Sequence, residues 1–343
     1  MLKKLVLLLP LFLSIPLSFA QEPSEGWKRL KDMPEVRSEM ESAAINDKIY
    51  VIGGFNNKSE GTNTVFIYDI KEDTWDLGAP MPLSLHHAAT TSFEEKVYVV
   101  GGYLDSWTPS NSLLIYDSKM DTWMVGPDMP TPRGALTAQF LDEKMFAVGG
   151  VNEGVLSVNE VYDPKTNTWE TKTQMPSSRE HLASAVLDNY LYVIGGRDAN
   201  QWNKDLNERY NPQTDSWDTL EPLPTARSGL TASVLNGAIF VFGGESNLKT
   251  YEENEAFVPG DGWFSQEPMP ISRHGLSSAT IGNNIYLIGG GATPGFSFSA
   301  IAEEYHNTII PEFGSTAGLI LIISLLVIIG LTTAKNSLFT KLR

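Results

Sequence analysis

The sequence predicts an all-β domain of six four-stranded units that close into a propeller. Two features that each occur six times carry this prediction, a glycine pair after an apolar run and a tryptophan ahead of it. From each repeated tryptophan to the next glycine pair is 26 residues in all six cases, whereas the distance from a glycine pair to the following tryptophan varies between 20 and 22. A stacked unit with a fixed core and one variable loop behaves this way. The glycine pairs are Gly53-Gly54, Gly101-Gly102, Gly149-Gly150, Gly195-Gly196, Gly243-Gly244 and Gly289-Gly290, and the tryptophans are Trp27, Trp75, Trp123, Trp169, Trp217 and Trp263.

Each unit divides into four predicted strands. The first is small and alternating, as in residues 42–45, 182–187 and 230–235, which suits an innermost position where the units crowd toward one axis. The second ends at the glycine pair and carries an aromatic residue three positions before it, which is typical of a strand packed on both faces. The third holds a tyrosine or phenylalanine, often followed by an aspartate or asparagine that opens a turn. The fourth begins at the tryptophan and ends in Met-Pro or Leu-Pro, and proline is tolerated best on an outer strand.

Two glycines, then Tyr-Asp, then Trp resemble the kelch repeat from residue 27 to about residue 308. The resemblance implies a six-bladed kelch β-propeller, a family that includes enzymes as well as binding modules. The sixth glycine pair is followed by Tyr305 and no tryptophan, whereas Trp27 precedes the first pair with no strands before it. We therefore expect the strand at Trp27 to complete the last blade beside Tyr305, which would leave no free sheet edge.

Both ends of the chain differ from the middle. Residues 1–20 combine Lys3 and Lys4 with a short apolar run and a small-x-small site ending at Ala20, which predicts a secretory signal peptide. Residues 315–334 are apolar with no charge and are long enough to cross a bilayer as a transmembrane helix. The basic residues of 335–343 follow, so the positive-inside rule places residues 21–309, the propeller, outside the cell.

Residues 310–314 contain the sequence Pro311-Glu312-Phe313-Gly314 immediately before this apolar segment. The motif, the span and the basic tip together resemble the PEFG-CTERM sorting signal of archaeal surface proteins. That resemblance implies an archaeosortase as a partner, with cleavage near Pro311 to Gly314 and transfer to another anchor. The alternative is a juxtamembrane turn before a permanent span. In both cases we expect the protein to lie on the extracellular face of the cell membrane, attached by the C-terminal helix or by a sortase-attached anchor.

The charge of the chain excludes one class of partner. The sequence has 41 Asp and Glu against 25 Lys and Arg, and five of the basic residues lie in the two terminal segments. An acidic surface of this kind repels nucleic acid and anionic lipid headgroups. The sequence contains no cysteine, so the fold depends on its core and its closure. No motif indicates a cofactor.

One mouth of the predicted channel carries arginines in the loops that lead into the innermost strands. Each lies three residues after a proline, and arginine binds carboxylate or phosphate in a bidentate manner. We therefore predict that some of them contact an anionic ligand, the alternative being that they hydrogen-bond loop carbonyls. The second unit has Leu85 in this place, followed by His86 and His87. The predicted ligand-binding residues in these loops are Arg37, His87, Arg133, Arg179, Arg227 and Arg273.

The loops between second and third strands supply the other candidates. Trp107 and Trp202 lie outside the repeat, and Arg197 follows a glycine pair, so we predict stacking on sugar rings or on the side chains of a partner. A metal site built from His87, His181 and His274 is the alternative use of the histidines. We expect no metal, because neighbouring arginines would repel a cation and the three histidines do not share one register.

Two functions remain open. The first is a binding module for a surface glycan, an anionic small molecule or another surface protein. The second is a carbohydrate-active enzyme of sialic-acid-epimerase or lyase type, with Glu39, Glu180 or Glu245 beside a channel arginine, although no motif assigns a catalytic residue. Copper-radical oxidase chemistry is excluded, because its tyrosine–cysteine cross-link needs a cysteine. A deep pocket with a glutamate in reach of an arginine would favour the enzyme, and a flat aromatic-rimmed mouth would favour the binder.

Overall fold

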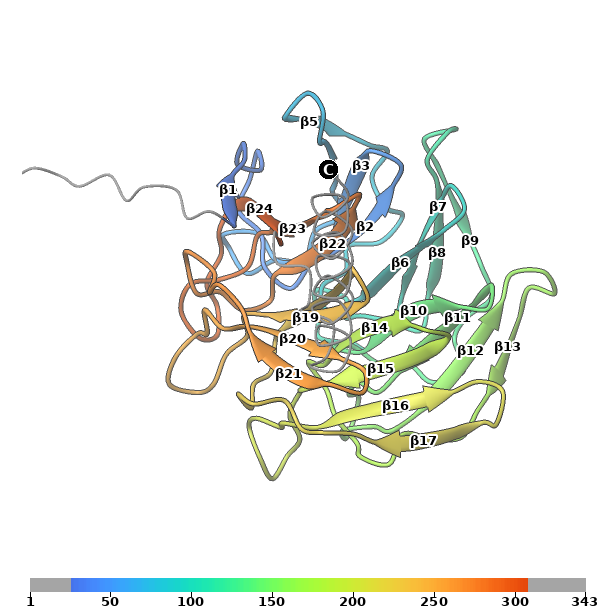
Figure 1. The fold of residues 1–343 in the computed structure, drawn as a ribbon. Helices are drawn as coiled ribbons and strands as arrows, with labels where there is room; N and C mark the ends of the chain where they lie inside the picture. The colour runs from blue at the N-terminus through green and yellow to red at the C-terminus, as the bar shows by residue number, and fades with distance from the viewer. Residues whose placement is uncertain (1–25, 308–343) are drawn as a thin grey trace, which may run out of the picture.

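The computed structural model describes residues 26–307 of the chain. The predicted signal peptide, PEFG motif, membrane span and basic tail lie outside the described residues. Within the described part, 24 strands form six sheets of four antiparallel strands, arranged as blades around a common axis (Figure 1). The six-bladed propeller predicted from the repeat is confirmed. No helix between residues 26 and 307 is long and apolar enough to cross a membrane.

In each blade the strands run from the channel to the rim. Blade 1 contains β2 (Glu41–Ile45), β3 (Lys48–Ile52), β4 (Val65–Asp69) and β5 (Thr74–Leu77). Blade 2 contains β6 (Ala89–Phe93), β7 (Lys96–Val100), β8 (Leu113–Asp117) and β9 (Thr122–Val125). Blade 3 contains β10 (Thr137–Leu141), β11 (Lys144–Val148), β12 (Asn159–Asp163) and β13 (Thr168–Thr171).

The second half of the chain repeats this order and then returns to the N-terminus. Blade 4 contains β14 (Ala183–Leu187), β15 (Tyr190–Ile194), β16 (Asn207–Asn211) and β17 (Ser216–Thr219). Blade 5 contains β18 (Thr231–Leu235), β19 (Ala238–Phe242), β20 (Asn254–Val258) and β21 (Gly262–Ser265). Blade 6 contains β22 (Ser277–Ile281), β23 (Asn284–Ile288), β24 (Ala302–His306) and β1 (Trp27–Arg29).

Blade 6 is closed by the first strand of the chain. β1 pairs antiparallel with β24, and Trp27 lies opposite Tyr305 with their ring centroids 4.8 Å apart. In Figure 1 the blue β1 lies beside the orange-red β24. The predicted closure by the N-terminal strand is confirmed. Because β24 pairs with β23 on one side and with β1 on the other, the last sheet has four strands, as each of the other five does.

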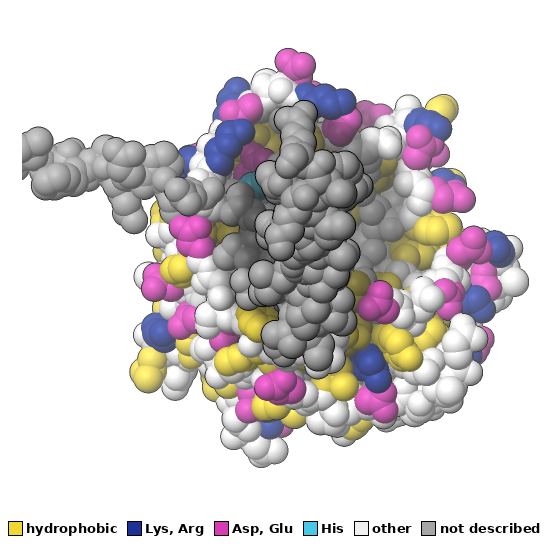
Figure 2. Space-filling model, viewed as in Figure 1, with side chains coloured by type: hydrophobic (Ala, Val, Ile, Leu, Met, Phe, Trp, Pro, Cys, Tyr) yellow, Lys and Arg dark blue, Asp and Glu magenta, His cyan; other side chains and the backbone are white. Residues whose placement is uncertain are grey.

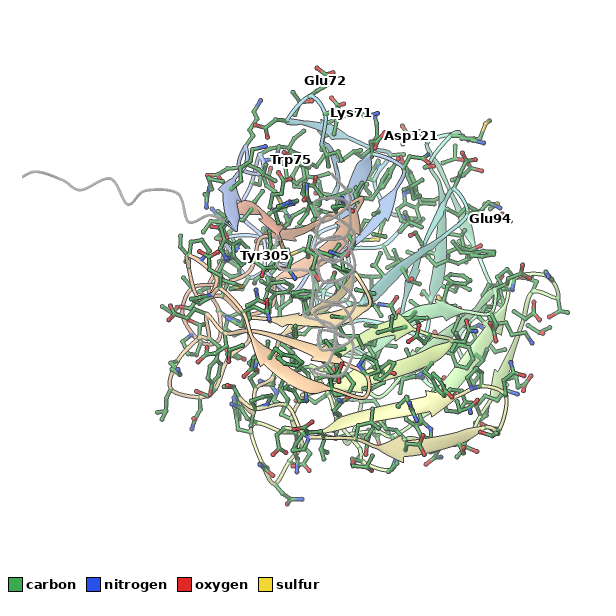
Figure 3. The ribbon with its side chains drawn as sticks, viewed as in Figure 1. Lys71, Glu72, Trp75, Glu94, Asp121 and Tyr305 are labelled. Atoms are coloured by element: carbon green, nitrogen blue, oxygen red, sulfur yellow. The ribbon has the colours of Figure 1, made fainter. Side chains whose placement is uncertain are left out.

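The repeated tryptophans join each blade to the one before it. Each donates its indole N–H to a carbonyl oxygen just beyond the outer strand of the preceding blade, at 2.7–3.4 Å. Trp75, for example, donates to Lys31 at 2.8 Å, and it lies inward of the turn that carries Lys71 and Glu72 (Figure 3). A hydrogen bond that recurs at every junction explains why a tryptophan recurs in every unit. The carbonyl acceptors are Lys31, Ala79, Pro127, Thr173, Glu221 and Glu267.

The glycine pairs make the second junction between blades. Gly101 and Gly102 both have positive φ, 68° and 88°, and the N–H of Gly102 donates to the carbonyl oxygen of Arg133 in the next blade at 2.9 Å. A Cβ on Gly101 would lie 2.6 Å from that same oxygen, so a side chain would push the two blades apart. The same contact recurs at each of the other five pairs.

The core consists of apolar layers between neighbouring blades. Ile49 and Val51 of blade 1, for example, pack with Tyr286 and Ile288 of blade 6. Charged side chains of both signs are intermixed around the rim in the view of Figure 2, with apolar side chains between them. On this face the acidic excess of the sequence is therefore spread over the blades.

Candidate functional site

A closed ring of main-chain hydrogen bonds lies where the loops enter the innermost strands. One residue from each blade donates its N–H to the carbonyl oxygen of the equivalent residue in the preceding blade, at 2.9–3.0 Å. All six residues have left-handed backbone angles, with φ between 50° and 63°. Gly229 and Gly275 adopt this conformation at little cost, whereas the other four have side chains that disfavour it. The members of this main-chain ring are Glu39, His87, Ala135, His181, Gly229 and Gly275.

The main-chain ring divides the channel. Around the ring itself the cavity has a volume of only about 40 Å³. On the side of the inner strands it widens to about 300 Å³, lined by Ser, Thr, Ala and Val side chains and by Gln139. On the loop side it opens into a pocket of about 380 Å³, which we call the mouth pocket. The mouth pocket is lined by Ser38, Glu39, Phe55, His87, Trp107, His181, Arg197, Trp202, Glu245, Asn247, His274, Pro294, Gly295 and Phe296.

Arg197 is the centre of a polar network in this pocket. Its Nε donates to Glu180 at 2.7 Å, its Nη1 donates to Glu245 at 3.2 Å, and its Nη2 lies 3.3 Å from Nε2 of His181. Burial alone would raise the pKa of Glu180, but the charges and hydrogen bonds of His181 and Arg197 lower it to about 2. Glu180 is therefore ionised at neutral pH. Glu245 also accepts the N–H of Gly295 at 2.9 Å.

Three histidines reach the floor of the mouth pocket with one ring nitrogen already engaged. Nδ1 of His181 donates to Glu180 at 2.6 Å, Nδ1 of His274 donates to the carbonyl oxygen of Gly291 at 3.1 Å, and Nδ1 of His87 shares a hydrogen bond with His86 at 2.7 Å. Burial, followed by the charges of His181 and His86, lowers the pKa of His87 well below its usual range. His87 is therefore uncharged at neutral pH.

Aromatic side chains form the rim. Trp107 is 50% exposed and Trp202 is 47% exposed, and the guanidinium of Arg197 stacks over the Trp202 ring at 4.5 Å. Phe55 contacts both Trp107 and Phe296, each with ring centroids 5.7 Å apart. A half-exposed tryptophan held in place from one side presents its other face to a ligand.

The five arginines predicted to bind an anion lie elsewhere. Each is at most 1% exposed and none lines the mouth pocket. Four of them form a buried ion pair with a glutamate on the third strand of the same blade, as Arg133 does with Glu160 at 2.5 Å, and they also donate to backbone carbonyls. Arg37 instead donates to Glu35 and lies over the Phe66 ring, 5.2 Å from its centroid. The five are Arg37, Arg133, Arg179, Arg227 and Arg273.

The other predicted residues come together. His87, Arg197, Trp107 and Trp202 all line the mouth pocket. Glu180 and Glu245 lie within hydrogen-bond distance of Arg197, so the pocket combines the feature expected of an enzyme with the aromatic rim expected of a binding module. His87 and His181 do share one register, since both belong to the main-chain ring, and His274 lies one position before a ring member. Sequence reasoning missed this because the ring register also contains Glu, Ala and Gly.

Three of these side chains have the donor set of a metal site. The carboxylate of Glu39 and the imidazoles of His87 and His181 each offer one ligand atom, and these atoms lie within 4.8 Å of one another.

Comparison with known proteins places the fold. The chain matches the sequence model of the KLHDC2/KLHL20/DRC7 Kelch-repeats domain over residues 39–244 and 86–290. It is 45% identical over 64 residues to a putative F-box/kelch-repeat protein of Arabidopsis thaliana, an alignment that covers 18% of this chain and 17% of that protein's length. A solved structure described as the structure of YjhT superimposes with a TM-score of 0.70 at 16% identity, covering 80% of this chain and 95% of that chain. At that identity the structural likeness concerns the fold alone.

Proposed function

Since this chain belongs to the Kelch-repeat family, we propose that it is a cell-surface binding module whose mouth pocket takes one sugar unit of a surface glycan. Kelch propellers generally mediate protein interactions, so the choice of a glycan rests on the lining of the pocket and not on the family. The observation that carries the proposal is that two half-exposed tryptophans and several hydrogen-bonding side chains line one pocket of about 380 Å³. That volume lies within the range of small-ligand pockets.

The chemistry of the lining favours a sugar. A pyranose ring has an apolar face that stacks on tryptophan, and hydroxyl groups at its edge that donate to carboxylates and accept from a guanidinium. Trp107 and Trp202 supply the first kind of contact, and Glu39, Glu245 and Arg197 supply the second. Each of these side chains already has a partner that fixes its position, which lowers the entropic cost of binding.

An anionic ligand is less suited to this pocket. The arginines that would have bound it are buried in ion pairs, and the guanidinium of Arg197 is already contacted by Glu180 and Glu245. Since Glu39 also faces the pocket, carboxylates outnumber the one guanidinium there. We therefore expect neutral or amino sugars to bind better than sialic or uronic acids.

A glycan array tests the proposal. The full-length chain is compared with Trp202→Ala and Trp107→Ala, and with Phe264→Ala, which removes an aromatic side chain that is 46% exposed but outside the pocket. Losing a stacking contact should weaken binding by up to about tenfold in the two tryptophan variants and leave the control unchanged. An array with no neutral or amino-sugar ligand, or equal binding by all variants, would rule the proposal out. Binding of a surface protein instead, with the same dependence on the tryptophans, would replace the glycan by a protein partner.

We further propose that the propeller faces the outside of the cell, attached through its C-terminal segment. The charge pattern of residues 1–20 and 315–343 supports this arrangement. Protease added to intact cells should then digest the propeller. The sorting proposal adds that the mature protein ends near Pro311 to Gly314. The intact mass of the cell-surface form tests this. A form that retains Arg343 would support a permanent span instead.

A second function, catalysis on a carbohydrate, is favoured by one observation. Glu245 lines the mouth pocket within hydrogen-bond distance of Arg197, which places a carboxylate where it can exchange a proton with a bound sugar. Nuclear magnetic resonance of free monosaccharides incubated with the chain would detect epimerisation or anomer exchange. Activity that is lost in Glu245→Gln while sugar binding persists would establish the enzyme. Unchanged spectra at high protein concentration would leave binding as the function.

A further inference from the structure

We propose that Glu39, His87 and His181 bind a divalent transition-metal ion, with zinc as the best match, at the floor of the mouth pocket. The three side chains project from one main-chain ring, and their ligand atoms lie within 4.8 Å of one another. Two imidazoles and one carboxylate form a ligand set that zinc uses in catalytic sites, where the fourth position stays open. All three residues line the mouth pocket, so the open position would face a bound ligand.

The hydrogen bonds of His181 define which of its nitrogens is available. A carboxylate only accepts, so the Nδ1 of His181 carries the proton that it donates to Glu180 at 2.6 Å. A guanidinium only donates, so the Nε2 of His181, 3.3 Å from Arg197, presents its lone pair. A histidine whose Nδ1–H donates to a carboxylate and whose Nε2 carries the lone pair has the usual arrangement of a metal ligand.

His87 and Glu39 are already close to the separation that a metal requires. Nε2 of His87 lies 3.4 Å from a carboxylate oxygen of Glu39. Ligand atoms held by zinc at about 2.1 Å in a tetrahedron are about 3.4 Å apart. His87 and His181 have ring centroids 4.9 Å apart, and Nδ1 of His87 has His86 as its hydrogen-bond partner. Small side-chain rotations would therefore bring the three ligand atoms around one ion.

The charge near the floor permits a cation. Arginines elsewhere in these loops are neutralised inside the blades, which removes the repulsion expected from the sequence. Arg197 is the guanidinium in the pocket, and Glu180 and Glu245 both contact it. Glu39 then remains as a carboxylate whose neighbours are imidazoles, His87 at 3.4 Å and His274 at 3.7 Å. A metal bound at Nε2 of His181 would displace the contact of Arg197 with that nitrogen, while Arg197 keeps its two carboxylate partners.

The main-chain ring also holds the three proposed ligands at a strained backbone position. A non-glycine residue in the left-handed region is strained by roughly 1–2 kcal/mol. Blades 5 and 6 avoid that cost with Gly229 and Gly275, whereas Glu39, His87 and His181 accept it, as Ala135 does in blade 3. Strained backbone conformations of this kind are often found at ligand-binding sites.

Zinc binding to the full-length chain tests the proposal. The chain is stripped with a chelator, and zinc uptake is measured by equilibrium dialysis with metal analysis, in the absence of any glycan. We expect one tightly held zinc per chain. His87→Gly and His181→Gly should remove it, and both changes have a precedent in the same ring at Gly229 and Gly275, so the fold should persist. Circular dichroism of each variant checks the fold.

Two further variants set the scale. Glu180→Gln alters the partner of a ligand and should weaken zinc binding roughly 10- to 100-fold, less than either glycine variant. His306→Ala removes an exposed histidine outside the pocket and should change nothing. Zinc binding that survives in both glycine variants, or that excess magnesium displaces, would assign the ion to surface carboxylates and overturn the proposal. So would a folded wild-type chain that takes up no zinc. Because no sugar is used, neither result bears on glycan binding.

Discussion

Arg179 donates from Nη2 to the carboxylate of Glu208 at 2.7 Å, and both side chains are at most 1% exposed. The second carboxylate oxygen accepts the hydroxyl of Ser177 at 2.6 Å. Blade 2 has Leu85 in the arginine position and Leu114 in the glutamate position, and both pack in one apolar cluster. The fold therefore accepts either a paired charge or a pair of leucines at this place.

Arg179 and Glu208 should tolerate replacement together but not singly. Arg179→Leu or Glu208→Leu alone leaves a buried charge without its partner and should lower the free energy of unfolding by about 3–5 kcal/mol. The double variant copies blade 2 and should recover most of that loss. Denaturant unfolding of the four proteins gives the coupling energy. A double variant whose loss equals the sum of the single losses would contradict this reading.

The closing strand should hold the last blade through Trp27. Trp27 is buried against Tyr305 and Phe242, so Trp27→Ala should lower the free energy of unfolding by roughly 3–5 kcal/mol. Deleting residues 26–32 should expose the edge of β24 and cause association between molecules, visible by size-exclusion chromatography. Trp202→Ala, a half-exposed tryptophan, is the control and should cost little. A deletion variant that stays monomeric and equally stable would show that closure needs no β1.

The third-strand tyrosines should make stability depend on pH. The hydroxyl of Tyr210 donates to Asp215 at 2.6 Å, and this bond is the main cause of the lowered pKa of Asp215. A carboxylate with a lowered pKa stabilises the fold above its unfolded pKa of about 3.9, and that stabilisation fades as the pH falls further. The stability difference between wild type and Tyr210→Phe should therefore shrink between pH 6 and pH 3.

Blade 3 supplies the matched control for that measurement. Tyr162 makes the equivalent bond to Asn167 at 2.8 Å, and an asparagine does not titrate. Tyr162→Phe should cost the same at both pH values. Equal pH dependence in the two variants would mean that Asp215 is not the titrating group.

Ala135 allows the main-chain ring to be tested without touching the mouth pocket. Its φ of 50° suits glycine, so Ala135→Gly should leave stability unchanged or raise it by up to about 1 kcal/mol. Ala135→Pro removes the N–H that donates to His87 and cannot adopt a positive φ, so it should cost about 3 kcal/mol or more. Thermal unfolding of the two variants measures the difference. Similar stabilities would mean that the ring contributes nothing to folding.

The repeat made the fold readable from the sequence, because identical junctions require identical residues. The 26-residue spacing follows from a tryptophan that reaches the preceding blade and a glycine pair that contacts the next one. The unpaired Trp27 and Tyr305 then left one way to close the last sheet.

The site was harder to predict for two physical reasons. An arginine in a loop at the mouth of the channel looks the same in the sequence whether it faces solvent or a buried glutamate. The sequence signal for the buried pair was that blade 2 replaces both members at once, with Leu85 and Leu114. Backbone conformation was also hidden. Glu39, His87 and His181 occupy equivalent positions with a left-handed backbone conformation. Glutamate and histidine do not predict that conformation, so the proximity of the three side chains appeared only in the structure.

The main-chain ring uses only peptide atoms, and its six bonds run in the same direction from blade to blade. The backbone conformation of the ring is therefore the same whichever of these side chains a position carries, since Glu, His, Ala and Gly occupy equivalent places in it. The side chains at these six positions can therefore be substituted while the backbone stays the same. A related propeller could acquire a different ligand preference through such substitutions, with no change in its blades.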